Sequence, residues 1–153
     1  MKNVIIHFGP GRRIALRPEF LPAPMAALRK VLQYADQTGE TEEVCRAFLQ
    51  NADHLSTIYS EHAARYDSEQ LKTLGIMQMV MRERDEARAR LKTEKDPSAK
   101  KAIKDSIPKL TKRIRDLGEA RRSELRAKID YERSLEKLKK NREVIEGWQS
   151  RRK

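Results

Sequence analysis

The sequence predicts a mainly α-helical protein with a small N-terminal β-hairpin, a helical bundle and a long antiparallel, coiled-coil-like helical hairpin. Charged residues make up 37% of the 153 residues, nearly as many as the 38% that are hydrophobic, and only 5% are aromatic. This composition is far from the usual globular mix and favours long, exposed helices. Apolar residues also recur at intervals of three and four along much of the chain, which is the period of an amphipathic helix.

The net charge of +11 lies entirely in the second half of the chain. Residues 1–75 contain nine basic and nine acidic residues, whereas residues 76–153 contain 25 basic and 14 acidic ones. We therefore predict a neutral hairpin-plus-helices subdomain over residues 1–67 and a basic helical-hairpin arm over residues 68–153. A basic surface of this kind attracts phosphates, acidic protein faces or anionic membranes.

Cysteine content and hydropathy predict a cytoplasmic protein without a membrane span. The single cysteine, Cys45, cannot form an internal disulfide, which favours a reducing compartment. The N-terminal stretch MKNVIIHFGPGRR has too short an apolar run for a signal peptide, and no stretch reaches the roughly eighteen apolar residues of a transmembrane helix.

The first seventeen residues predict the β-hairpin. VIIHF and RRIAL are short runs with β-branched residues, and Gly9-Pro10-Gly11 between them is a strong turn signal. An isolated hairpin is only marginally stable, so it should lie on the rest of the protein or pair with another copy. Arg12, Arg13 and Arg17, close to this turn, are candidate phosphate-binding residues.

Three helices are predicted between the hairpin and the arm's turn. Pro24 can occupy the first turn of a helix through MAALRKVLQYADQT, which Gly39 ends as the residue after the C-cap. Thr41 is the predicted N-cap of a second helix that continues to about residue 66. Ser68 is the predicted cap of a third, which ends before Asp96-Pro97.

The arm should fold back on itself, with its turn around KDPSAKK. In SIPKLTKRIRDLGEARR, residues 106–122, Pro108 either starts a new helix or kinks an existing one. Apolar residues spaced like a coiled-coil seam run from Ile103 to Leu117, stop at Gly118 and resume in a shifted phase from Leu125 through Ile129 to Ile145. We expect this seam to be covered by the preceding helix, through Leu74, Met77, Met81 and Leu91.

A strand, a helix, a turn and a second helix follow one another over residues 12–52. RRIALRPEF precedes a helix that ends in YADQTG, and TEEVCRAFLQNA forms the next helix. This order resembles the ribbon-helix-helix family of DNA-binding proteins. The resemblance implies a dimer whose paired strands enter the major groove, with Arg13, Ala15 and Arg17, or else Arg12, Ile14 and Leu16, facing the DNA. The chain departs from the family in having VIIHF as an internal partner strand and LPAP between strand and helix.

Catalytic chemistry finds little support in the sequence. There is no glycine-rich phosphate loop and no serine nucleophile motif. His54 and His62, with Glu61 between them, are loosely spaced like metal ligands, but the apolar period favours core or surface histidines. We therefore predict no enzymatic activity, no catalytic residues, no metal and no cofactor.

The leading hypothesis is a non-enzymatic helical binding protein: an adaptor, assembly factor or inhibitor that docks onto a larger complex with an acidic surface through its basic arm. The candidate partner-binding residues are Arg113, Arg115, Arg121, Arg122, Arg126, Lys139, Lys140 and Trp148. Trp148 either docks back on the protein or anchors the partner. The alternative is a DNA- or RNA-binding protein that uses the same arm on phosphates, and a homo-oligomeric coiled coil is a third possibility.

Overall fold

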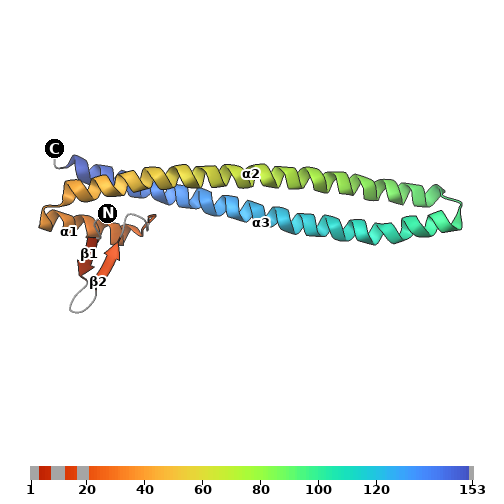
Figure 1. The fold of residues 1–153 in the computed structure, drawn as a ribbon, viewed down its shortest axis with the longest axis horizontal. Coiled ribbons are helices and arrows are strands. Elements are labelled where there is room, and N and C mark those ends of the chain that lie inside the picture. Colours follow the sequence, from red (N-terminus) through yellow and green to blue (C-terminus); the bar gives the residue numbers. More distant parts are fainter. Residues whose placement is uncertain (1–3, 8–12, 17–20, 152–153) are drawn as a thin grey trace. The chain divides into compact units, whose positions relative to one another are not determined.

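The computed structural model describes the backbone of residues 4–7 and 13–16 and the whole of residues 21–151 (Figure 1). The described residues contain three helices: α1 (Met25–Thr38), α2 (Thr41–Thr93) and α3 (Pro97–Ser150). The prediction of a mainly helical protein is confirmed.

Two short strands precede the helices, β1 (Val4–His7) and β2 (Arg13–Leu16), paired antiparallel with Val4 opposite Leu16. The turn Gly9-Pro10-Gly11 lies outside the described residues, so the hairpin stays a prediction. Two of the candidate phosphate-binding residues, Arg12 and Arg17, also lie outside them, and only the backbone of Arg13 is described.

The C-terminus of α1 forms as the sequence predicts. Gly39 has a left-handed φ of 75°, and its N–H donates to the carbonyl of Asp36 at 3.4 Å. The N–H of Glu40 donates to the carbonyl of Ala35 at 2.9 Å. This pair of bonds satisfies the last carbonyls of the helix and requires a residue that tolerates positive φ.

Helix α2 is continuous from Thr41 to Thr93, so the predicted boundary between residues 66 and 68 is wrong. Ser68 can cap a helix, but no glycine or proline near it stops the preceding one. Thr41 is also not the N-cap: the carbonyl of Glu40 accepts the first bond, from Val44, at 2.9 Å. The Thr41 hydroxyl instead donates to Asp36 Oδ1 at 2.5 Å.

Helix α3 begins at Pro97, so the turn between α2 and α3 is shorter than the KDPSAKK segment that the sequence predicts for it. Asp96 is its N-cap: the Asp96 carbonyl accepts from the Lys100 N–H at 2.9 Å, and Asp96 Oδ2 accepts from the Ala99 N–H at 3.4 Å. Proline suits the first helical position because its missing N–H would have no partner there. Pro108 then lies inside the helix rather than at its start.

The chain divides into two compact units that interleave in sequence. Unit 1 comprises residues 1–62 and 130–153, and unit 2 comprises residues 63–129. Each unit therefore receives one portion of α2 and one portion of α3.

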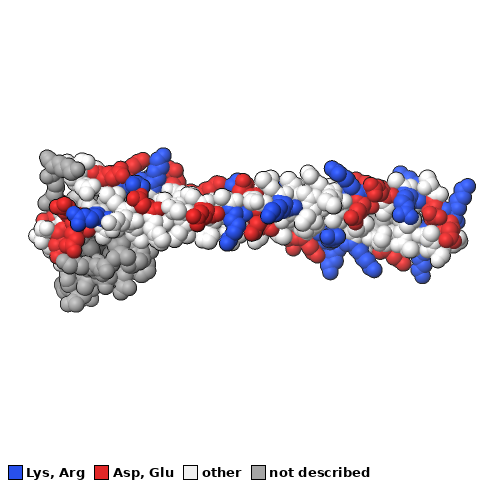
Figure 2. All heavy atoms as spheres, turned by 45° about the horizontal axis from the view of Figure 1, so that its top comes forward, with Lys and Arg blue, Asp and Glu red and all other residues white. Residues whose placement is uncertain are grey.

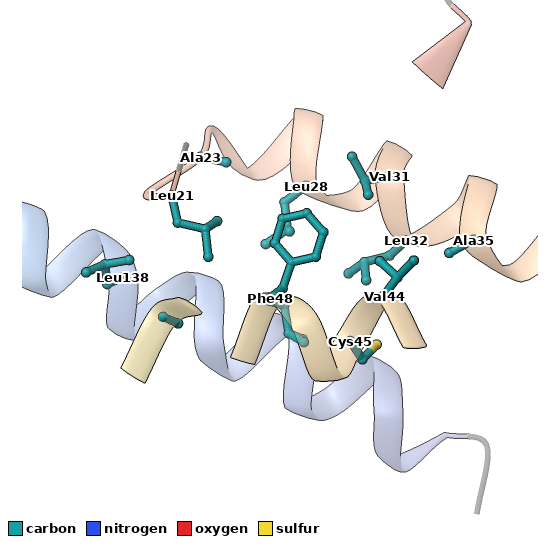
Figure 3. Packing of buried hydrophobic residues seen from close by; sticks show 12 residues of the cluster. Leu21, Ala23, Leu28, Val31, Leu32, Ala35, Val44, Cys45, Phe48 and Leu138 are labelled. Atoms are coloured by element: carbon teal, nitrogen blue, oxygen red, sulfur yellow. The ribbon is translucent and has the colours of Figure 1, made fainter. Parts of the chain in front are cut away.

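Unit 1 contains the main hydrophobic core, built where α1 and the unit 1 portions of α2 and α3 meet (Figure 3). Phe48 of α2 lies near its centre, fully buried, close to Leu28 of α1. Leu138 and Ile145 of α3 are buried in the same cluster. Cys45 is part of this core, as expected of a small apolar side chain.

Polar contacts also connect α2 to α3 within unit 1. Arg142 pairs with Asp53 of α2 and donates to Glu146 Oε1 at 2.9 Å, and this hydrogen bond raises the pKa of the Arg142 guanidinium. The imidazole of His62 stacks on the ring of Tyr131, with centroids 5.0 Å apart. His62 is therefore a half-buried packing residue.

In unit 2, α2 and α3 pack antiparallel along a heptad seam. The α3 seam residues, buried or half-buried, keep one phase throughout and are Ile103, Ile107, Leu110, Ile114, Leu117, Arg121, Glu124 and Lys128. The predicted shift of phase after Gly118 is wrong, because polar residues occupy the in-phase positions while Ile129 is 42% exposed. On α2, Val80 is buried in the seam and the predicted Met81 is 37% exposed.

Candidate partner-binding surface on helix α3

The excess positive charge of unit 2 lies mainly on α3. Residues 97–129 contain eleven basic and four acidic residues. At 100° per residue, six of the basic residues fall within an arc of about 80° around the helix axis. These six residues, which we name the α3 basic stripe, are Lys101, Lys104, Lys112, Arg115, Arg122 and Arg126.

The stripe lies on the side of α3 that faces away from the seam. All six side chains are exposed, and none of them forms an ion pair within residues 21–151. One acidic residue, Glu119, falls in the same arc, and Asp105 lies at its edge. From Lys101 to Arg126 the stripe extends about 37 Å along the helix. It is therefore a long row of cations without fixed counter-charges.

The structure separates the predicted arm residues into three groups. Arg115, Arg122 and Arg126 belong to the stripe. Arg113 lies on the opposite flank of the outer surface, and Arg121 lies in the seam, where its Nε donates to Gln70 Oε1 at 3.2 Å. Lys101, Lys104 and Lys112 are not among the partner-binding residues predicted from the sequence. Their alignment with the three arginines appears only when residues 97–126 are placed on one continuous helix.

The remaining predicted residues belong to unit 1. Lys139 and Lys140 are exposed, and Lys140 borders a shallow depression beside Pro22 and Asn141. Trp148 packs against the hydrophobic core, and its indole Nε1 donates to Asp36 Oδ2 at 3.0 Å. Of the two alternatives for Trp148, the structure has the ring docked on its own protein.

Acidic and basic side chains are interleaved on the face of the molecule in Figure 2. In the seam of unit 2, three polar pairs take the place of apolar contacts. Lys128 Nζ donates to Asp67 Oδ1 at 2.9 Å, Arg121 binds Gln70, and the Thr73 hydroxyl donates to Glu124 Oε1 at 2.9 Å. We call these six residues the polar layer. Because each member has a partner on the facing helix, the layer favours one register.

The polar layer gives unit 2 an acid-sensitive contact. Hydrogen bonds from Lys128 and Gln70 hold the pKa of Asp67 below its ordinary value of 3.8. The stabilisation is therefore complete above that value and is lost as the pH falls through the lower, folded-state pKa. We expect Asp67→Asn to lower the melting temperature at about pH 6 and to have no effect near pH 2. Thermal unfolding at both pH values tests this, and a deficit that persists in acid would contradict it.

Other kinds of site find no support in the described part of the chain. Within residues 21–151, no group of three or more His, Cys, Asp or Glu side chains is placed to hold a metal ion. None of the three described helices has an apolar stretch long enough to cross a membrane.

Comparison with models of protein families, with curated proteins and with solved structures finds no match for this chain. The class of protein therefore rests on its own geometry. That geometry consists of a small helical core in unit 1 and a helical pair in unit 2 that carries the α3 basic stripe.

Proposed function

We propose that this chain is a non-enzymatic helical binding protein, acting as an adaptor, assembly factor or inhibitor, which docks onto an acidic face of a larger protein complex through the α3 basic stripe. The single observation that carries the proposal is the alignment of six exposed, unpaired cations on one arc of α3. Such a row gives a long contact surface without requiring a large hydrophobic core beneath it. Its charges would orient the partner and speed association, and the binding would weaken with salt.

The composition around the stripe favours a protein partner over single-stranded nucleic acid. Residues 97–129 contain no aromatic residue that could stack on a base. Glu119 within the stripe and Asp105 at its edge would repel phosphates but can pair with basic residues on a protein surface.

One observation favours the alternative, binding to the backbone of a nucleic-acid duplex. The cations recur every eleven residues, from Lys101 to Lys112 and from Lys104 through Arg115 to Arg126. Eleven residues correspond to about three turns and about 16 Å. The first and last groups of cations are thus separated by roughly one turn of duplex DNA, about 34 Å. A spacing of this kind would suit phosphate contacts without base recognition.

Charge reversal tests the proposal better than truncation. Residues 135–153 include Leu138, Asn141 and Ile145, which are buried in unit 1, so deleting them would remove core as well as charge. The test variant is Arg115→Glu/Arg122→Glu/Arg126→Glu. The matched control is Arg88→Glu/Lys109→Glu/Arg113→Glu, which reverses the same number of exposed charges away from the stripe.

The probes are labelled polyglutamate, random-sequence duplex DNA and single-stranded RNA, titrated across a salt series near physiological ionic strength. We expect the stripe variant to bind polyglutamate at least about tenfold more weakly than wild type, which is the loss of a few exposed charge contacts, while the control changes little. Equal losses in both variants would contradict a stripe-specific site. Tighter binding to duplex DNA than to polyglutamate, with a steep linear fall of log affinity against log salt, would establish the alternative.

A further inference from the structure

The outer surface of α2 in unit 2 carries apolar side chains that nothing within the described chain covers. Leu71 is 55% exposed and Met79 is 61% exposed. They lie one helical turn before and after Gly75, and a Cβ built on Gly75 would meet no atom within 4 Å. Glycine is among the least favourable residues in a helix interior. The packing of unit 2 gives no reason for it, whereas close approach of another backbone would.

Two lines of residues with a seven-residue repeat run along α2 at this glycine. On α2, Ser68, Gly75 and Arg82 recur every seven residues and form one line along the helix. A neighbouring line, with the same repeat, consists of Arg65, Lys72, Met79 and Glu86. We name these two lines, with Leu71, the α2 outer strip.

The second line is basic at its N-terminal end and acidic at its C-terminal end. Arg65 and Glu86 lie ten and eleven residues from Gly75, on opposite sides of it. Both are exposed, and neither forms an ion pair within residues 21–151, although the Arg65 guanidinium lies over the ring of Tyr66. An antiparallel copy of the same helix would therefore bring opposite charges together at both ends.

We propose that the α2 outer strip binds a second copy of this chain, antiparallel, with the two-fold axis passing through Gly75. In this arrangement Gly75 faces Gly75 of the second copy, so the two helices can approach closely. Arg65 faces Glu86 of the second copy, and Lys72 lies against Met79 of the second copy. The interface is isologous, so each contact occurs twice.

The same charges disfavour the parallel orientation. A parallel, in-register pair would place Arg65 against Arg65 and Glu86 against Glu86, and opposed like charges repel. The self-association uses α2 and does not rest on the function proposed for the α3 basic stripe.

Sedimentation equilibrium of the full-length protein tests the charge pattern. We expect a monomer–dimer equilibrium in wild type, weakened at least about tenfold by Arg65→Glu or Glu86→Arg, because each change disrupts both ends of the interface. The double variant Arg65→Glu/Glu86→Arg should restore the wild-type constant, and Arg88→Glu, which lies off the strip, should leave it unchanged. A wild-type dissociation constant weaker than about 1 mM, or a double variant no better than the singles, would overturn the proposal.

A size test at the axis uses a matched pair of glycines. Gly75→Leu should abolish the dimer because the added side chain holds the helices apart. Gly147→Leu, at another helical glycine with open space around its Cβ, should leave the dimer intact. Circular dichroism shows whether each variant is folded. A folded Gly75→Leu variant that still forms the wild-type dimer would overturn the proposal.

Cysteine cross-linking distinguishes the two orientations. Gly75→Cys should form a disulfide-linked dimer under mild oxidation, because the two copies of residue 75 meet at the axis. Ala89→Cys lies on the same line, but in an antiparallel pair its two copies are about 42 Å apart and should not link. The native Cys45 is buried and stays in place. Linking through Ala89→Cys would indicate a parallel pair and overturn the proposal.

Discussion

Replacing Asn141 with leucine will destabilise unit 1 by about 2 to 5 kcal/mol, because it strands two buried backbone groups. Asn141 is only 1% exposed. Its Oδ1 accepts from the Ala23 N–H at 2.8 Å, and its Nδ2 donates to the Ala23 carbonyl at 3.0 Å. Ala23 is itself buried, so water cannot readily replace the lost partners.

Denaturant unfolding followed by circular dichroism measures this loss. Lys139→Leu is the control, because it introduces the same side chain at an exposed position nearby. The control should change stability by no more than about 0.5 kcal/mol. An Asn141→Leu variant as stable as the control would show that the two hydrogen bonds between Asn141 and the Ala23 backbone contribute nothing to the free energy of unfolding.

Replacing Phe48 with alanine will cost about 3 to 5 kcal/mol, the range for deleting a fully buried aromatic side chain. Phe48 has no exposed surface and lies within the cluster formed by all three helices of unit 1. The loss combines the transfer free energy of the ring with the cavity that it leaves. A loss of this size is a large part of the total free energy of unfolding of a small domain, so we expect partial unfolding of the variant at room temperature.

Thermal and denaturant unfolding test this prediction, with Ile129→Ala as the control. Ile129 is 42% exposed in unit 2, so its truncation should change stability by less than about 1 kcal/mol. Equal losses for the two variants would mean that Phe48 is not central to the core.

The predictions that succeeded depended on local signals. Gly39 ends α1 because the chain there needs positive φ, which favours glycine whatever surrounds it. The prediction of a helical chain succeeded because composition and apolar period sum over many residues. The assignment of Arg115, Arg122 and Arg126 as binding residues, which the sequence makes from charge, stays a prediction.

The predictions that failed concerned register and boundaries. Ser68 resembles a helix cap, yet it lies inside α2. For Pro108 the sequence left two alternatives, a helix start or a position inside a helix, and the structure has it inside α3. Arg121 and Glu124 are polar, so the sequence predicts a break in the apolar seam at these positions. Each is satisfied by a partner on α2, and a partner distant in sequence leaves no signal near Gly118.

The sequence by itself determined that this protein is helical, that its charge is concentrated in the second half, and where the first helix ends, because these properties depend on neighbouring residues or on totals. Only the tertiary structure decided which polar residues are paired, and therefore which cations remain unpaired. Lys128 and Arg121 are engaged across the seam, whereas the α3 basic stripe is left exposed. The physical reason is that the residues of the facing helix decide whether a charged side chain is paired within the protein or remains free to bind a partner.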